Sequence, residues 1–90
     1  MKIQSLNWDE YRIEHIAIHN VTPEQVWEAC CDLLHIARKI SNQRYLIYGQ
    51  AYSGRYLFIV IEKETETEYK PITARDMTDN ERKNFRKIRK

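Results

Sequence analysis

The sequence has little of what marks linkers, exported domains or membrane proteins. Only two glycines and two prolines occur among its 90 residues, too few for a flexible linker or a low-complexity tract. No apolar run approaches the roughly 20 residues that cross a bilayer, and the opening MKIQSLNWDEY lacks the apolar stretch of a signal peptide. We therefore expect a single domain over residues 1–90, in the cytoplasm, with no membrane partner.

Cysteine is scarce too, since Cys30 and Cys31 are the only two and lie side by side. Neighbouring helical side chains point in different directions, so we expect small buried thiols in a reducing compartment and no disulfide. His35 alone is a poor metal partner for them. His15 and His19 have the four-residue spacing that can ligate a metal, but histidine is also favoured near the C-terminal end of a helix. We predict no metal and no cofactor.

What the chain has in excess is positive charge at one end. The ten residues from Glu81 to Lys90 hold six basic side chains and one acidic one, a local charge of +5. Since the whole chain carries +2, the first eighty residues together carry −3. This concentration predicts an anionic partner, either the phosphate backbone of RNA or an acidic protein surface. A solvated helix face remains the alternative.

Side-chain patterning predicts three helices and four strands. Each helix start carries an N-cap residue with Glu or Gln three positions later, the capping-box pattern. The three pairs are Asn7 with Glu10, Thr22 with Gln25, and Thr78 with Glu81. The helices are expected over residues 8–19, about 23–36, and from residue 79 onward. The strands are expected over Lys2–Leu6, Arg44–Ala51, Tyr56–Ile61 and Thr67–Arg75.

The strand sequences also indicate how the sheet is built. Tyr56–Ile61 is a continuous apolar run, so we expect it to be the central strand, buried on both faces. Pro71 cannot donate to a ladder, which places its strand at an edge or gives it a bulge. The order β-α-α-β-β-β-α predicts an α+β fold in which an antiparallel sheet packs against helices on one side.

Three segments occur together in the order and spacing of one known family: WDEYRIEHIAIHNVTPEQVWEA, RYLIYGQAYSGRYLFIVIE and ITARDMTDNERKNF. They resemble the Trp-Asp-Glu opening, the Gly-Arg turn, and the Ser/Thr-Ala-Arg and Glu-Arg motifs of the BrnT family of bacterial toxins. The resemblance covers most of the chain, residues 6 to 88. It implies a fold similar to RelE-type toxins, metal-independent cleavage of RNA, and inhibition by a BrnA-type antitoxin that forms a complex with the toxin.

Carried over residue by residue, the resemblance implies His19, Arg55, Arg75 and Glu81 as catalytic residues, with Arg44 as a further RNA contact. Metal-free RNA cleavage needs proton transfer at the 2′-hydroxyl and the leaving oxygen, and cations for the phosphorane dianion. We assign proton transfer to His19, phosphate contact to the arginines at positions 55 and 75, and a second acid or base role to Glu81. Local explanations remain open, a capping box for Glu81 and protection of an edge strand for Arg75.

Other residues are candidates for RNA binding alone. Tyr52, in the turn signal Tyr52-Ser53-Gly54, is a candidate for stacking on an unpaired base, whereas most of the other tyrosines are expected in packing. Arg82 and Arg86 of the basic end are expected to follow the phosphate backbone. Arg44 either joins them or simply flanks its strand.

The chain departs from the family pattern at three positions. Ile18 stands where a basic residue is usual, Asn20 replaces glycine, and Phe85 replaces a frequent tyrosine. The first and last changes remove polar groups, so the resemblance allows reduced or lost activity. We expect an endoribonuclease of a toxin–antitoxin pair. The rivals are a weakened relative that binds RNA or a protein partner without cutting, and a structural interaction domain.

Overall fold

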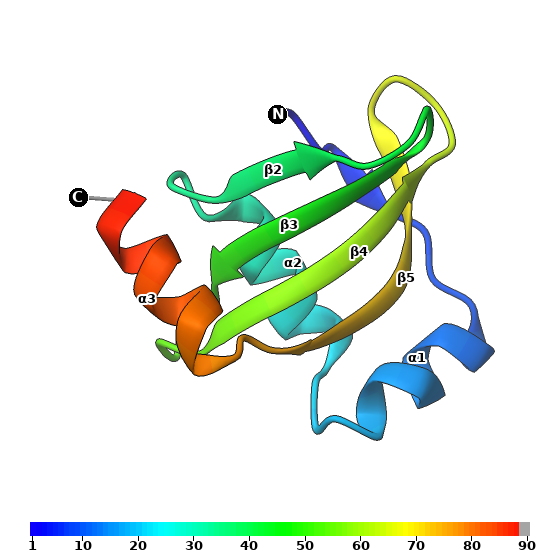
Figure 1. Ribbon diagram of the computed structural model, residues 1–90. Helices are drawn as coiled ribbons and strands as arrows, with labels where there is room; N and C mark the ends of the chain where they lie inside the picture. The colour runs from blue at the N-terminus through cyan, green and yellow to red at the C-terminus, as the bar shows by residue number, and fades with distance from the viewer. Residues whose placement is uncertain (89–90) are drawn as a thin grey trace.

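The computed structural model describes residues 1–88 as a twisted five-stranded sheet with three helices (Figure 1). The helices are α1 (Glu10–Ala17), α2 (Pro23–Cys31) and α3 (Asp79–Ile88). The strands are β1 (Ser5–Leu6), β2 (Ile36–Lys39), β3 (Arg44–Gln50), β4 (Tyr56–Lys63) and β5 (Glu68–Asp76). Their order across the sheet is β1-β5-β4-β3-β2. The predicted α+β class is confirmed, but the sheet is mixed, because β1 runs parallel to β5 while the other neighbours are antiparallel.

The core lies between the sheet and α2, and α1 lies beside β5 and contributes Ile16 to this core (Figure 1). Ile47, Ile59 and Ala74 face each other across β3, β4 and β5 and are fully buried there. Helix α2 approaches β3 so closely that a Cβ on Gly49 would overlap the backbone carbonyl of Ala29. Glycine at this position therefore sets the distance between the helix and the sheet.

The expectation that all helices share one side of the sheet is wrong for α3. This helix follows β5 and lies at one end of the opposite face (Figure 1). Phe85 of α3 is buried and its ring meets the Tyr56 ring edge-on, with 6.0 Å between centroids. The narrow apolar stripe of α3 is enough to seat it against the aromatic side chains of the strands, while its basic side chains stay outside.

Strand β2 was not expected, and the predicted helix over 23–36 is wrong after Cys31. Asp32 ends α2 with an extended ψ of 121°. Its carboxylate accepts hydrogen bonds from the backbone N–H groups of Leu34 (3.1 Å) and Gln50 (3.0 Å). The first bond forms an Asx-type turn and the second ties the turn to β3, so the chain leaves the helix and adds a strand.

Two of the three expected helix starts are confirmed, those of α2 and α3. Thr22 and Gln25 form a reciprocal capping box at α2, with bonds of 3.1 and 3.2 Å. The start of α1 lies two residues later than predicted, because the carboxylate of Asp9 accepts from Arg12 N–H at 2.8 Å. Asn7 instead donates its backbone N–H to Tyr69 and continues the pairing of β1, which is shorter than expected.

Strand β4 is central, as predicted, but it is not buried on both faces. Leu57, Ile59 and Ile61 are fully buried, while the alternate residues are only half-buried. The strand with Pro71 carries the predicted bulge, where the register shifts between Val60 and Ile61. β1 then pairs with the beginning of that strand, so β5 is not the outermost strand of the sheet.

Both cysteines are free thiols, as expected, but only one is buried. Burial raises the pKa of Cys30 to about 12, which makes this thiol a poor nucleophile at neutral pH. Cys31, at the last residue of α2, is exposed, which corrects the expectation of two buried thiols. Among the helices described within residues 1–88, none has the length and apolar character needed to cross a membrane.

Candidate functional site

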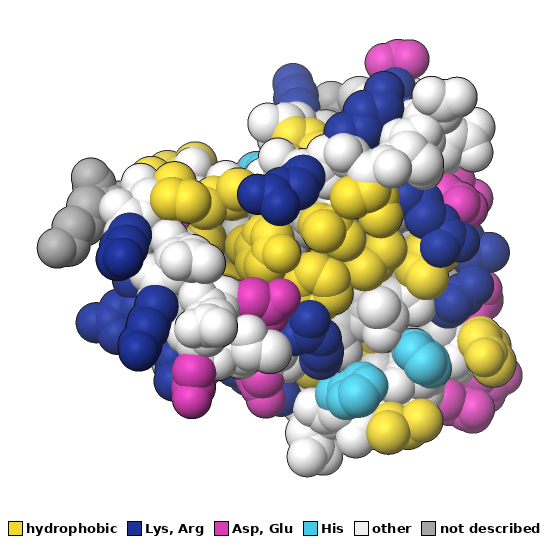
Figure 2. Space-filling view, in the orientation of Figure 1, with side chains coloured by type: hydrophobic (Ala, Val, Ile, Leu, Met, Phe, Trp, Pro, Cys, Tyr) yellow, Lys and Arg dark blue, Asp and Glu magenta, His cyan; other side chains and the backbone are white. Residues whose placement is uncertain are grey.

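The face of the sheet opposite α1 and α2 is only partly covered, and we call it the open sheet face. Two rows of side chains cross it in register from β2 to β5. One row is Ile36, Tyr48, Phe58 and Arg75, and the other is Arg38, Leu46, Val60 and Thr73. Figure 2 shows hydrophobic side chains gathered in the middle of this face, with Lys and Arg side chains around them. An apolar, largely aromatic floor with a cationic rim is the surface that unpaired nucleotides bind.

Arg75 and Glu81 form the best-defined ion pair on this face. The two guanidinium nitrogens Nη1 and Nη2 donate to the two carboxylate oxygens at 2.9 and 3.2 Å, a bidentate pair six residues apart. The guanidinium lies over the Phe58 ring, 4.1 Å from its centroid. Nη1 donates to Glu81 and to the Asp76 carbonyl, and Nη2 donates once, to Glu81. Within residues 1–88 this leaves the Nε–H and one Nη2–H of Arg75 without a partner. Arg75 therefore keeps donors for a ligand while its position is fixed.

The carboxylate of Glu81 is held in its ionised form. Its hydrogen bond with Arg75, and further bonds from Thr78, lower the pKa of Glu81 below the ordinary value. The confirmed capping box at α3 supplies these bonds, with Thr78 N–H donating to Glu81 at 2.8 Å and Glu81 N–H donating to the Thr78 hydroxyl at 3.2 Å. At neutral pH Glu81 can accept a proton but has none to donate.

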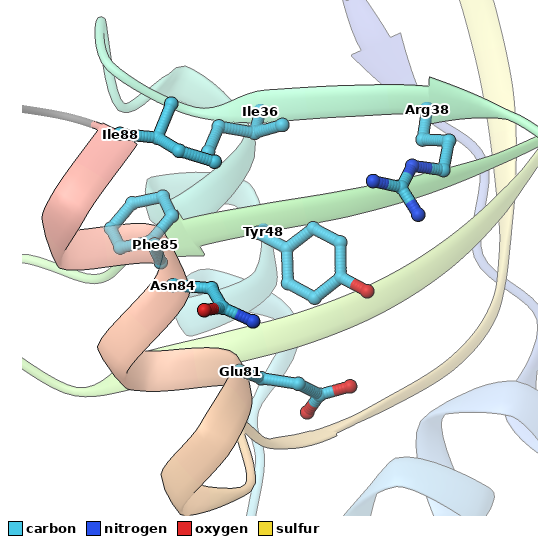
Figure 3. Close-up of a pocket in the computed structure, with 7 residues that line it drawn as sticks. All are labelled: Ile36, Arg38, Tyr48, Glu81, Asn84, Phe85 and Ile88. Atoms are coloured by element: carbon cyan, nitrogen blue, oxygen red, sulfur yellow. The ribbon is translucent and has the colours of Figure 1, made fainter.

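A pocket of about 140 Å³ opens between α3 and the strands β2 and β3. Figure 3 shows its layout, with the Tyr48 ring lying across the strands as a floor. Apolar side chains gather at the α3 end, and polar side chains stand toward the open side. The lining residues are Ile36, Phe85 and Ile88 at the apolar end, and Arg38, Tyr48, Glu81 and Asn84 at the polar one.

Arg38 is a cation of this site that sequence analysis missed. It is exposed on β2 and extends over the open sheet face (Figure 3). No acidic side chain described within residues 1–88 pairs with it. Tyr48, Phe58 and Asn84 were missed with it. The signal that was present is the alternation of β3 and β4, which places positions 46, 48, 58 and 60 on one face; β2 itself gave no such signal.

Arg55, predicted as a phosphate clamp, holds the protein's own chain instead. Its guanidinium donates to Asp76 (2.6 and 3.1 Å), to the carbonyls of His19 (2.9 Å) and Asn20, and to the Gln25 side chain (3.1 Å). Every N–H of the group thus has a partner. Arg55 ties the turn after α1 to the end of β5, which is a positioning role. The prediction that it contacts phosphate stays a prediction.

His19 lies in that turn, exposed to solvent. The next residue, Asn20, has a φ of +58°, as expected of a helix breaker, and asparagine tolerates this left-handed conformation. The His19 ring lies edge-on to His15 at 6.3 Å, and its charge helps to lower the pKa of Asp76 after the larger effect of Arg55. His19 thus belongs with the Arg55–Asp76 pair, while Arg75 and Glu81 form a separate pair; the Arg75 bond to the Asp76 carbonyl joins the two.

The residues predicted for RNA binding lie around these groups. Arg44 is ion-paired with Glu62 at 3.1 Å, and Arg82 with Asp79 at 2.8 Å. Tyr52 is 80% exposed in the turn between β3 and β4, which leaves its ring accessible for stacking. Arg86 is exposed on α3, and its neighbours in the basic end, Arg89 and Lys90, lie outside the described residues.

The other predicted tyrosine contacts are packing contacts. Tyr45 meets Tyr69 edge-on at 5.9 Å beneath the sheet, and Tyr48 meets Phe58 at 5.4 Å on the open face. Among the residues that the structure describes, no group of three or more His, Cys, Asp or Glu is placed to hold a metal ion. The chemistry available at this face is therefore that of arginine, carboxylate, phenol and amide groups, with imidazole near the Arg55–Asp76 pair.

No protein-family model matches the chain, and a search of the curated proteins finds no significant relative.

Proposed function

We propose that this protein is a toxin-type endoribonuclease, resembling the BrnT family, that cleaves RNA without a metal on its open sheet face. The observation that carries the proposal is the bidentate Arg75–Glu81 pair seated on the Phe58 ring. The pair places a fixed cation with unused donors beside an ionised carboxylate, next to an apolar floor that includes the Tyr48 and Phe58 rings. That combination suits a phosphodiester between unpaired nucleotides.

The roles of Glu81 and Arg75 follow from their charges and contacts, and the role of His19 follows from the family resemblance. Glu81, held ionised by Arg75, is the group that accepts the proton of the 2′-hydroxyl as that oxygen attacks phosphorus. The unused N–H groups of Arg75 donate to the equatorial phosphate oxygens, where negative charge grows in the transition state. The 5′-oxygen then leaves with a proton, and His19 is the assigned donor. Arg55 contributes by holding the His19 carbonyl and so fixing the turn that carries this ring.

The partners proposed for this function are RNA and a BrnA-like antitoxin, in the cytoplasm. The open sheet face supports both, since an inhibitor that covers it would block RNA directly. Arg38, Arg75 and the exposed basic residues of α3 favour an acidic inhibitor segment there.

The test is cleavage of a single-stranded RNA by the purified chain in excess chelator. Glu81→Gln keeps the size of the side chain and a hydrogen-bond acceptor but removes the base, so cleavage should fall by about 100-fold or more. Cleavage by Arg75→Lys should fall by a similar factor, because lysine cannot make the bidentate contact. Glu62→Gln is the matched control, because Glu62 also pairs with an arginine, Arg44, and it should retain cleavage. Undiminished cleavage by Glu81→Gln, or cleavage that requires an added metal, would contradict the proposal.

A second candidate function is RNA or protein binding without cleavage. Two observations favour it: Phe85 is buried against Tyr56 and offers no hydroxyl where the family often has tyrosine, and Ile18 is 75% exposed yet carries no charge. Salt-dependent RNA binding by a folded chain that leaves the RNA intact is the result that this candidate predicts.

A further inference from the structure

The pocket beside α3 has a shape and a set of polar groups that phosphate chemistry alone does not use. Its α3 end is apolar, formed by Ile36, Phe85 and Ile88, and its floor is the Tyr48 ring. Such a slot suits a flat group with apolar faces.

Among the described residues, three polar side chains at the mouth of the pocket make no hydrogen bond within the protein. Within residues 1–88 the guanidinium of Arg38, the side-chain amide of Asn84 and the hydroxyl of Tyr48 make no hydrogen bond or ion pair with the protein. By contrast Glu81 already accepts hydrogen bonds from Arg75 and from the α3 cap. Three neighbouring groups with open donors and acceptors therefore face one hollow, from β2, β3 and α3 (Figure 3).

We propose that this pocket binds a single unpaired nucleobase, with Asn84 hydrogen-bonding its polar edge. A base has an apolar face that can lie on the Tyr48 ring, and a polar edge that needs both donors and acceptors, which an amide supplies. Arg38 stands where it can reach either a base acceptor or the adjoining phosphate. The inference rests on the proposed function, because it places one nucleotide of the same RNA beside the Arg75–Glu81 pair, and it gives that RNA a base preference at one position.

The experiment measures binding without cleavage. The probe is a short chain of abasic 2′-O-methyl ribose phosphates that carries one base, either A, C, G or U, so the base itself sets the register. The blocked 2′-oxygen prevents strand scission. A fully abasic chain of equal length is the reference. By fluorescence anisotropy the wild type should bind the preferred base about tenfold more tightly than the abasic chain, the effect of one stacked base, and the four bases should bind unequally.

Asn84→Ala should make the four bases bind alike, while Asn42→Ala, an exposed asparagine in the loop between β2 and β3, should keep the wild-type preference. Equal affinity for the base-bearing and abasic chains would overturn the inference, and so would a preference that survives Asn84→Ala. If the pocket instead binds a side chain of a protein partner, the base-bearing and abasic chains should bind with equal affinity. If the chain cleaves RNA but shows no base-dependent binding, only this inference is wrong. If it binds bases through Asn84 but does not cleave RNA, only the proposed ribonuclease activity is wrong.

Discussion

At the scale of single residues, two arginines that look equivalent in the sequence have different tasks. All N–H groups of the Arg55 guanidinium donate to the protein, chiefly to the turn after α1 and to Asp76. Arg75, over the Phe58 ring, has N–H groups without a partner within residues 1–88. The resemblance points to both positions, but no local pattern separates them. The difference arises from contacts 21 and 36 residues away in the chain, which a sequence does not display.

Replacing Arg55 with alanine should therefore destabilise the fold. The change leaves Asp76 and two turn carbonyls without their donor, and we expect a loss of about 2 kcal/mol, or roughly 10 °C in Tm. Arg44→Ala is the matched control, because its pair with Glu62 is largely solvent-exposed and should contribute under about 1 kcal/mol. Thermal unfolding by circular dichroism measures both. Equal shifts for the two variants would show that Arg55 does not fix the turn.

The Arg75–Glu81 pair should make stability depend on pH in the acid range. Because the folded-state pKa of Glu81 is lowered, the pair stabilises fully above the ordinary glutamate pKa of 4.5. That contribution is lost as the pH falls through the lower folded-state value. Glu81→Gln should thus lower Tm at pH 7, and the difference from the wild type should shrink as the pH falls below 4.5. A Tm difference that stays constant from pH 7 down into this acid range, measured by differential scanning calorimetry, would argue against the pair.

At the scale of elements, two of the three predicted capping boxes were correct. Thr22 with Gln25 and Thr78 with Glu81 were found because the pattern is local and needs only four residues. Strand β2 was missed because Leu33 and Leu34 continue the helical spacing, and the Asp32 bond to Gln50 that turns the chain spans 18 residues. Leu33 is in fact 96% exposed, so its spacing did not report burial.

The closest contact between elements predicts the most damaging small substitution. Gly49→Ala forces a Cβ into the carbonyl of Ala29, and helix α2 cannot retreat without opening the core, so we expect a loss of about 3 kcal/mol. Gly54→Ala is the comparison, since its surroundings are open but its φ of +95° disfavours a side chain, a cost of about 1 kcal/mol. Urea unfolding measures both. A Gly49 variant as stable as the Gly54 variant would mean that α2 adapts.

At the scale of the molecule, the residues that form the core and those of the candidate site lie on opposite faces of the sheet. One face holds the core with residues of α1 and α2. The other carries the apolar floor (Figure 2), the Arg75–Glu81 pair and the pocket. The sequence indicates the class of fold and two members of this site, through the family resemblance. It did not reveal Arg38, Tyr48 or Asn84, because they converge from three elements, one of which was unexpected.

The salt dependence of RNA binding should report which cations face the RNA. Each phosphate contact contributes a slope of about −0.7 in log K against log salt for a single strand. Arg38→Ala should therefore reduce the slope by about 0.7, because this guanidinium has no partner within residues 1–88. Arg44→Ala should change it less, since Glu62 offsets that charge. Equal changes, measured by anisotropy over a salt series, would contradict the distinction.

The most direct test of the account is to locate RNA on the protein. In a methyl-labelled sample titrated with 2′-O-methyl RNA, the NMR signals of Ile36, Leu46 and Val60 report the open sheet face. Leu33 and Leu34 are exposed but lie in the turn that follows α2, and so serve as the reference. The account predicts saturable shifts at the three open-face methyl groups and little change at the two leucines. Shifts confined to the leucines, or none at saturating RNA, would contradict it.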